Sequence, residues 1–173
     1  MYKIIEKEIL APDVNMFIIE ARLIARKAAP GQFVLIRADE FGERTPMTIA
    51  DFDRRKGTIT LVVQKVGRST MKIGRLSVGE GFENVTGPLG TPTHLDKYGT
   101  VVVIGGGIGI APAHPVARGM KEHRNNVIVI MGARTKELLF WEDKMAAVSD
   151  ELYVSTDDGS YGVHGFVTTV LGD

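Results

Sequence analysis

The sequence predicts two domains, an antiparallel β-barrel followed by an α/β domain with a doubly wound parallel sheet. The first 98 residues contain short strand-like segments separated by glycine and proline, a pattern typical of antiparallel barrels. The remaining residues alternate apolar strands with helical stretches in the order β-α-β-α-β. We therefore place the domains at residues 1–98 and 99–173, with the junction in segment 95–99.

The barrel half contains five segments with strand character. The clearest is 58–64, which is rich in β-branched residues and follows a Lys-Gly turn signal. A short helix fits at 69–76, where Ser69 is suited to cap the first turn. The expected strands are 15–20, 32–37, 47–51, 58–64 and 81–85.

The second half opens with the continuous β-branched run 100–104. Such a run is typical of a strand buried on both faces of a parallel sheet. Further strands are expected at 126–131 and 151–155, with helices at about 113–123 and 138–148. We expect Trp141 on the packing face of the second helix and the four histidines on the surface or in loops.

Composition excludes several classes of protein. Lys+Arg and Asp+Glu are 21 each, so the formal net charge is zero. The chain therefore lacks the excess of positive charge that is typical of nucleic-acid-binding proteins. No apolar run approaches the roughly 20 residues of a membrane span, and the first residues lack the apolar stretch of a signal peptide. We therefore expect a cytoplasmic protein with no nucleic-acid partner and no membrane insertion.

Cysteine and glycine counts are the unusual features. The chain has no cysteine, which excludes disulfides, thiol catalysis and thiolate-held iron–sulfur clusters within these residues. No other set of side chains shows metal-ligand spacing, so no metal site is predicted. Glycine accounts for 20 of the 173 residues, and the positions of these glycines indicate where a binding site could lie.

The sharpest motif is Gly-Gly-Gly-Ile-Gly-Ile-Ala-Pro at 105–112, directly after the first buried strand. Glycines there let backbone amides approach a phosphate, and the following helix adds a favourable dipole. Pro112 fits the first helical turn. The spacing does not meet G-x-G-x-x-G and no acidic residue ends the second strand, so a standard Rossmann NAD site is not predicted. The alternative is a tight turn that binds nothing.

Loop 156–162 follows the third buried strand and contains Asp-Asp-Gly-Ser. Ligands of open α/β sheets bind outside the carboxyl ends of the strands, so we expect this loop to face the same crevice as 105–109. An ordinary surface turn explains the same residues.

The barrel half offers two further candidates. Segment 44–48 combines Arg44, which can pair with a phosphate, with a hydroxyl four residues later that can reach a ring nitrogen. Segment 67–70 combines glycine, a cation, two hydroxyls and a helix start, which makes a second phosphate cradle. An exposed loop arginine and a simple capped helix start are the respective alternatives, and 87–90 by itself reads as a turn.

These motifs, in this order, resemble the ferredoxin–NADP reductase family, and the likeness covers essentially the whole chain. It is strongest to FAD-containing electron-transfer subunits, namely the small subunit of NADH-dependent ferredoxin–NADP oxidoreductase (sulfide dehydrogenase) and that of dihydroorotate dehydrogenase. Its most specific parts are 105–112, 132–134 with 137–139, and 156–162 with 165–168.

The resemblance implies FAD bound between the two domains and a bound NAD or NADP. Thr48 would be the catalytic hydroxyl near flavin N5. The residues implied to hold FAD are Arg44, Thr45, Pro46, Met47, Thr48, Gly67, Arg68, Ser69, Thr70 and Gly87. The residues implied to hold the nicotinamide nucleotide are Gly105, Gly106, Gly107, Ile108, Gly109, Ala111, Pro112, Arg134, Asp157, Asp158, Gly159 and Ser160.

The implied function is a flavoprotein subunit that moves electrons between NAD(P)H, FAD and an iron–sulfur partner. The implied partners are a larger flavin/iron–sulfur catalytic subunit and ferredoxin. A non-catalytic flavin- or nucleotide-binding module, a dihydroorotate dehydrogenase subunit and a flavin-free structural domain remain alternatives. The sequence leaves NAD and NADP open, because Arg134 suits either a 2′-phosphate or a pyrophosphate.

The chain departs from the family pattern in three ways. Counting back from Thr48, the family motif Arg-x-aromatic-Ser/Thr places its arginine at Thr45 and its aromatic at Met47. Members of this branch carry cysteine ligands for a [2Fe–2S] cluster near the C-terminus, and this chain has no cysteine. Only five residues follow Thr168, so we expect an α/β domain without its C-terminal part and without the cluster segment.

Overall fold

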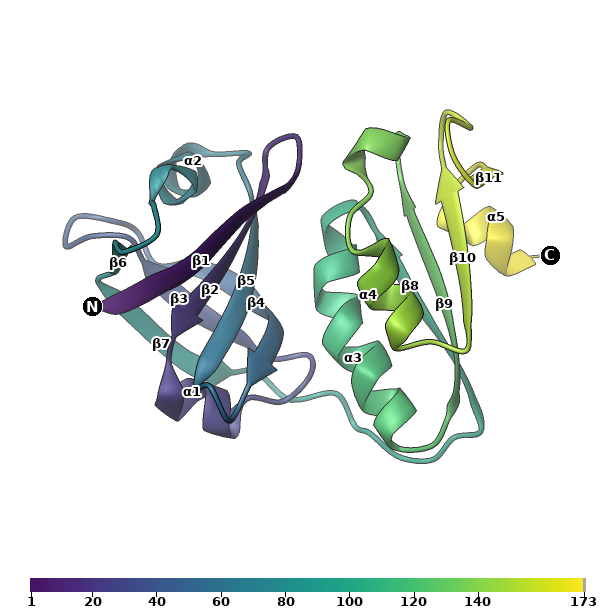
Figure 1. The fold of residues 1–173 in the computed structure, drawn as a ribbon, viewed down its shortest axis with the longest axis horizontal. Helices are drawn as coiled ribbons and strands as arrows, with labels where there is room; N and C mark the ends of the chain where they lie inside the picture. The colour runs from purple at the N-terminus through teal and green to yellow at the C-terminus, as the bar shows by residue number, and fades with distance from the viewer. Residues whose placement is uncertain (173) are drawn as a thin grey trace. The chain divides into compact units, whose positions relative to one another are not determined.

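A computed structural model describes residues 1–172. The chain forms two compact units, the first from Met1 to Thr93 and the second from His94 onward (Figure 1). The second unit therefore begins at 94, where the sequence suggested 99.

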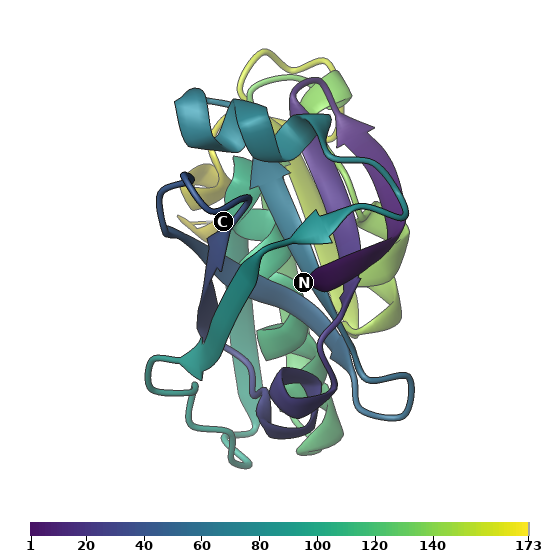
Figure 2. The ribbon, with the colours of Figure 1, turned by 90° about the vertical axis from the view of Figure 1, so that its left-hand side faces the viewer.

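The first unit is a seven-stranded antiparallel sheet in the order β6-β1-β2-β5-β4-β3-β7. Its strands are β1 (Tyr2–Ala11), β2 (Val14–Glu20), β3 (Phe33–Arg37), β4 (Thr45–Asp53), β5 (Thr58–Gln64), β6 (Gly81–Phe82) and β7 (Asn84–Leu89). The two edge strands, β6 and β7, are separated only by Glu83, so the sheet curls into a nearly closed barrel. Two helices, α1 (Arg22–Lys27) and α2 (Arg68–Arg75), lie at opposite ends of this barrel (Figures 1 and 2).

The barrel core is made by alternate residues of its strands. Phe17 and Phe82 are fully buried and meet edge to face, with ring centroids 6.2 Å apart. Lys7 fastens α2 to this sheet, because its Nζ donates to the carbonyls of Gly74 (2.7 Å) and Leu76 (2.8 Å) at the C-terminal end of the helix. The same ammonium lies 5.5 Å from the centroid of Phe17.

Strand β1 and helix α1 are absent from the sequence-based prediction, and both omissions have a physical reason. Register shifts interrupt the pairing of β1 with β2 between Ile4 and Glu6 and between Ile9 and Ala11, so the apolar residues of β1 do not alternate strictly. Helix α1 has six residues, too few to show a helical period.

The second unit is a parallel sheet in the order β11-β10-β9-β8. Its elements are β8 (Thr100–Gly106), η1 (Gly107–Gly109), α3 (Ile110–Glu122), β9 (Asn126–Ala133), η2 (Lys136–Leu138), α4 (Glu142–Ala147), β10 (Glu151–Thr156), β11 (Val163–His164) and α5 (Val167–Gly172). Helices α3 and α4 cover one face of the sheet, and α5 lies on the other (Figure 1). The predicted parallel α/β order is confirmed.

The expectation that 100–104 is buried on both faces is wrong. Val103 is buried, but Val102 and Ile104 are 43% and 40% exposed. These residues alternate along β8, so one face of the strand packs inward and the other is open. In the described part of the chain the six-residue α5 lies on the second face and does not cover it fully.

Two expectations about the helices of this unit are also wrong. Helix α4 spans only Glu142–Ala147, because Trp141 has a left-handed backbone (φ 61°) that cannot continue a right-handed helix. His114, expected at the surface, is 5% exposed on α3, and its ring lies 5.5 Å from that of Trp141.

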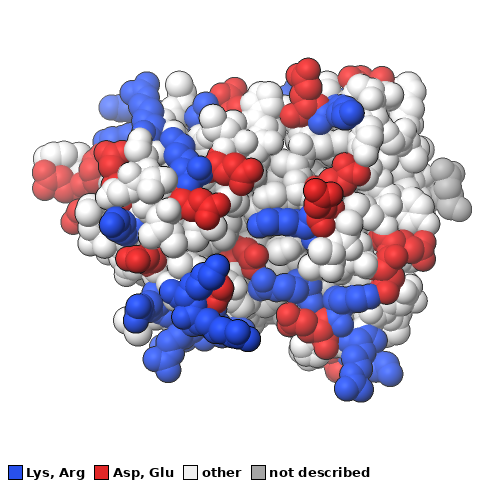
Figure 3. Space-filling model, viewed as in Figure 1, with Lys and Arg blue, Asp and Glu red and all other residues white. Residues whose placement is uncertain are grey.

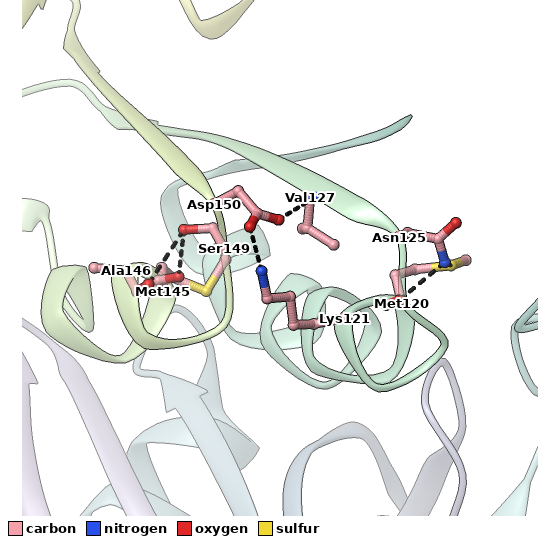
Figure 4. A network of polar contacts seen from close by, with 8 residues as sticks. All are labelled: Met120, Lys121, Asn125, Val127, Met145, Ala146, Ser149 and Asp150. Atoms are coloured by element: carbon pink, nitrogen blue, oxygen red, sulfur yellow. Dashed lines mark hydrogen bonds and ion pairs between the residues drawn. The ribbon is translucent and has the colours of Figure 1, made fainter. Parts of the chain in front are cut away.

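Two polar clusters tie the strand beginnings to the helices (Figure 4). Buried Asn125 accepts the backbone N–H groups of Tyr98 (2.6 Å) and Gly99 (3.0 Å) and donates to the Asp96 and Met120 carbonyls (2.8 and 2.9 Å). Asp150 accepts the Val127 N–H at 2.8 Å and pairs with Lys121 of α3. These contacts fix where β8 and β9 begin.

Candidate functional site

The carboxyl ends of three neighbouring strands meet at one edge of the parallel sheet. Gly106 at the end of β8 pairs with Gly132 of β9, and Gly132 pairs with Ser155 of β10. The loops that leave these strands therefore begin side by side, as the sequence predicted for the loops at 105–109 and 156–162. This is the edge at which open α/β sheets bind ligands.

The glycines of the 105–109 turn have two different tasks. A Cβ on Gly105 would lie 3.0 Å from the Gly109 carbonyl oxygen and 3.0 Å from Ile110 Cα, so Gly105 permits close packing of strand on helix. A Cβ on Gly106, Gly107 or Gly109 would meet nothing within 4 Å. The backbone at these three positions is therefore accessible to an incoming group. A turn that serves only to connect strand and helix has no need of such accessible backbone.

Helix α3 starts directly after this turn. Ile110 and Ala111 are buried and anchor the first turn, while Ile108 is 38% exposed. Pro112 is the third helical residue, as predicted, and its missing N–H costs no intrahelical bond there. The 13-residue helix thus begins next to the open glycine backbone, and its Ile110 N–H donates to the Gly107 and Ile108 carbonyls of the turn.

The loops after β9 and β10 are bonded to each other. The Asp157 N–H donates to the Ala133 carbonyl (3.1 Å) and the Asp158 N–H to the Arg134 carbonyl (3.2 Å). The Lys136 N–H donates to Ser160 Oγ (2.9 Å). Exposed Arg134 and the exposed residues of 157–160 therefore come together at this edge.

Loop 157–160 is itself a hydrogen-bonded turn. Asp158 Oδ1 accepts the Ser160 hydroxyl (2.6 Å) and the Ser160 N–H (3.0 Å). These bonds hold the pKa of the Asp158 carboxyl below its usual range, the hydroxyl bond contributing most. Gly159 has φ +73°, and a Cβ there would lie 3.0 Å from the His164 ring, so glycine is required in this turn.

Three polar residues at this edge are missing from the sequence-based set. The Tyr161 hydroxyl donates to Glu142 Oε1 (2.9 Å), and this bond raises the pKa of the Tyr161 phenol. Lys136 places its ammonium 4.8 Å from the centroid of the same ring. Glu142 and Tyr161 are 19 residues apart, and no local sequence signal links them.

The first candidate in the barrel, 44–48, lies at the start of β4. Arg44, Pro46 and Thr48 are exposed, whereas Thr45 and Met47 are half-buried. The period of two in a strand explains this division, and Met47 packs against the barrel core. The positions that match the family's arginine and aromatic residue therefore face inward, and Arg44 shares the outward face with Thr48.

The second barrel candidate, 67–70, forms the start of α2. Gly67, not Ser69, is the capping residue, because the helix begins one residue earlier than expected, at Arg68. The Thr70 hydroxyl accepts the Gly67 N–H and donates to the Gly67 carbonyl, both at 3.0 Å, which closes the first turn. Ser69 Oγ donates to Glu43 Oε2 at 2.8 Å, and this contact links α2 to the loop before β4.

Helix α2 carries a hollow of about 450 Å³ lined by Arg68, Met71, Lys72 and Arg75. Lys72 pairs with Asp39, and this bond is the main reason that the pKa of the Asp39 carboxyl lies below its usual range. A Cβ on Gly67 would meet nothing within 4 Å, so the helix start is open. The geometry offers an accessible backbone with cations next to it.

Gly87 has a packing role in this structure. A Cβ there would lie 2.7 Å from Val34 Cγ1, because β7 approaches β3 closely at this point.

The described residues contain no group of three or more His, Cys, Asp or Glu able to hold a metal ion. Within the same residues no helix is long and apolar enough to cross a membrane.

Several known proteins are similar in sequence to this chain. A dihydroorotate dehydrogenase B electron transfer subunit homologue of Thermotoga maritima is 42% identical over 169 residues, which cover 98% of this chain and 60% of that protein. The dihydroorotate dehydrogenase B electron transfer subunit of Geobacillus thermodenitrificans is 31% identical across 97% of this chain and 67% of its own length. The chain belongs to the family of dihydroorotate dehydrogenase B electron transfer subunits.

A solved structure has the same fold as this chain over nearly its whole length. The NADH-dependent reduced ferredoxin–NADP oxidoreductase structure superposes with a TM-score of 0.94 at 40% identity, over 99% of this chain and 62% of that one. The predicted barrel and parallel α/β architecture and the predicted resemblance are thereby confirmed. The chain spans about 60% of the length of the first curated relatives it matches, and no family model matches it.

Proposed function

We propose that this chain is a flavoprotein electron-transfer subunit that binds FAD on its barrel unit and a nicotinamide nucleotide on its parallel-sheet unit. The observation that carries the proposal is the open backbone at Gly106, Gly107 and Gly109 beside the start of α3. The names of the relatives, an NAD⁺-linked electron transfer subunit and an NADH-dependent oxidoreductase, support the same reading.

The parallel-sheet unit suits a dinucleotide diphosphate. The positive end of the α3 dipole lies next to the open glycines, whose backbone can approach a phosphate closely. Arg134 is exposed at the same edge and adds a permanent positive charge. NAD is the proposed nucleotide, since the Geobacillus subunit is named for NAD⁺ and the solved oxidoreductase is named as NADH-dependent.

The barrel unit suits a flavin dinucleotide. Thr48 and Arg44 lie on the same outward face of β4, and the open start of α2 offers N–H donors at Arg68 and Ser69. When bound, FAD supplies the hydride chemistry at N5, and the protein positions the ring and tunes it through hydrogen bonds. Thr48 is the residue proposed to donate to the ring, and Arg44 the residue proposed to meet a phosphate.

The proposed partners are a larger catalytic subunit and an iron–sulfur acceptor such as ferredoxin. These 173 residues contain no cysteine, so no thiolate ligand for a [2Fe–2S] cluster comes from them, and no electron-transfer step through a cluster in this chain is proposed.

Anaerobic titration tests the proposal. The purified chain, supplied with FAD, should show a flavin absorption spectrum that bleaches when NADH is added, and less readily with NADPH. A chain that binds FAD but is not reduced by either nucleotide would be a binding module only. A chain that takes up no FAD would overturn the proposal.

A further inference from the structure

A basic patch lies at the end of the barrel that carries α1. It consists of Arg22, Arg26 and Lys27 on α1 and of Arg54, Arg55 and Lys56 in the turn between β4 and β5. All six side chains are exposed. The chain as a whole is neutral, so this gathering is a local property, and Figure 3 shows Lys and Arg concentrated at the lower left, over α1.

The patch is built on a fixed framework. The Ala21 N–H donates to the Gly57 carbonyl (2.9 Å), and Arg54 Nη2 donates to the Ala28 carbonyl at the end of α1 (2.8 Å). Gly57 lies against the stem of Arg22, where a Cβ would come within 2.4 Å of Arg22 Cγ. The backbones of the helix and the turn, which carry these cations, are therefore held next to each other before any partner arrives.

Acidic side chains near the patch do not cancel it. Asp53 Oδ1 accepts the backbone N–H groups of Arg55 (2.8 Å) and Lys56 (2.9 Å), so its carboxylate stabilises the turn. With Glu20 and Asp51 included, the local balance is six positive groups against three negative ones.

The patch is separate from the candidate flavin residues. Arg54 follows Thr48 by six positions along β4 and its turn, about 20 Å at the usual rise per residue. The candidate helix start in α2 lies at the opposite end of the barrel (Figure 2). Neither the proposed FAD site nor the proposed nucleotide site uses these six cations.

We propose that the basic patch docks an acidic face of a partner protein. Four of its six cations are arginines, whose planar guanidinium groups pair bidentately with carboxylates and are enriched at protein interfaces. Leu23, 77% exposed among them, supplies an apolar anchor. A membrane surface fits less well, because Ile24 and Ala25 of α1 are buried in the barrel core and leave the helix no broad apolar face.

Charge reversal with a matched control tests the proposal on the whole chain. Arg26→Glu with Arg55→Glu changes the net charge by −4 within the patch, and Lys3→Glu with Lys97→Glu makes the same change at exposed positions outside it. The probe is a fluorescent oligoglutamate peptide, with anionic phosphatidylglycerol vesicles and a short DNA duplex in parallel. Circular dichroism verifies that each variant is folded, and Arg26→Gln with Arg55→Gln serves as a milder second variant.

The expected result is peptide binding that weakens with salt and drops about tenfold in the patch variant but much less in the control. Equal weakening in both variants, or no peptide binding, would overturn the proposal. Patch-dependent binding of vesicles or DNA without peptide binding would assign the patch to a membrane or a nucleic acid instead. Salt-sensitive self-association that the patch variant abolishes would assign it to a second copy of the chain.

Discussion

Glycines that look alike in the sequence differ in what surrounds them. Gly105 and Gly109 both belong to the predicted phosphate turn, yet only Gly105 is enclosed, by the Gly109 carbonyl and Ile110. Gly109 has an ordinary helical backbone (φ −64°) and open space where a side chain would project. A side chain at Gly105 should therefore lower the stability of the fold, whereas a side chain at Gly109 should affect ligand binding.

We expect Gly109→Ala to leave the melting temperature unchanged or slightly higher while slowing flavin reduction by NADH, because the new methyl group occupies the space proposed for phosphate. Gly105→Ala should instead destabilise the fold by about 1–3 kcal/mol through overpacking. Thermal unfolding and anaerobic stopped-flow reduction measure the two effects. Unchanged nucleotide affinity in a folded Gly109→Ala protein would remove this turn from the site.

Thr48 is the second position where one residue decides function. Its side chain lies on the outward face of β4, so Thr48→Val preserves the shape and removes only the hydroxyl. If that hydroxyl donates a hydrogen bond to the flavin, Thr48→Val removes a bond that contributes about 1–1.5 kcal/mol. The rate of flavin reduction should then fall roughly tenfold. Thr48→Ser keeps the hydroxyl and should keep the rate, and equal rates in Thr48→Val and wild type would exclude the assignment.

At the scale of elements, local pattern predicted the regular parts and missed what depends on distant contacts. The β-branched run 58–64 and the glycine turn before α3 were correct because a short window contains their cause. The two register shifts of β1 and the left-handed backbone of Trp141 interrupt the periodic patterns on which the prediction relies. The bond between Tyr161 and Glu142 was missed because it joins residues 19 positions apart.

Helix α2 provides an element-scale prediction. The Lys7 ammonium bonds two carbonyls at its C-terminal end from a strand more than 60 residues away. Lys7→Met keeps the stem but leaves these carbonyls without their charged donor, which should lower the free energy of unfolding by about 1–3 kcal/mol. Urea denaturation measures the loss, and exposed Lys3→Met is the control in the same strand. Equal effects of the two variants would contradict the fastening role.

Across the whole molecule, charge is balanced in number but not in placement. The described residues include four aspartates, Asp39, Asp53, Asp150 and Asp158, whose carboxyl pKa values lie below the usual range because of hydrogen bonds to Lys72, Lys56 N–H, Lys121 and Ser160, respectively. They belong to both units. Each bond favours the ionised carboxylate in the folded chain.

The folded state should therefore lose stability in acid. A carboxyl whose pKa is lowered by folding stabilises the protein fully above its unfolded pKa, near 3.8, and loses that contribution as pH falls toward its folded value. We expect Asp150→Asn, which ends the ion pair with Lys121, to lower stability at neutral pH and to flatten the decline below pH 3.8. Glu83→Gln removes an exposed carboxylate and is the matched control. Chemical denaturation as a function of pH measures both, and parallel pH profiles for Asp150→Asn and wild type would show that this pair does not drive acid unfolding.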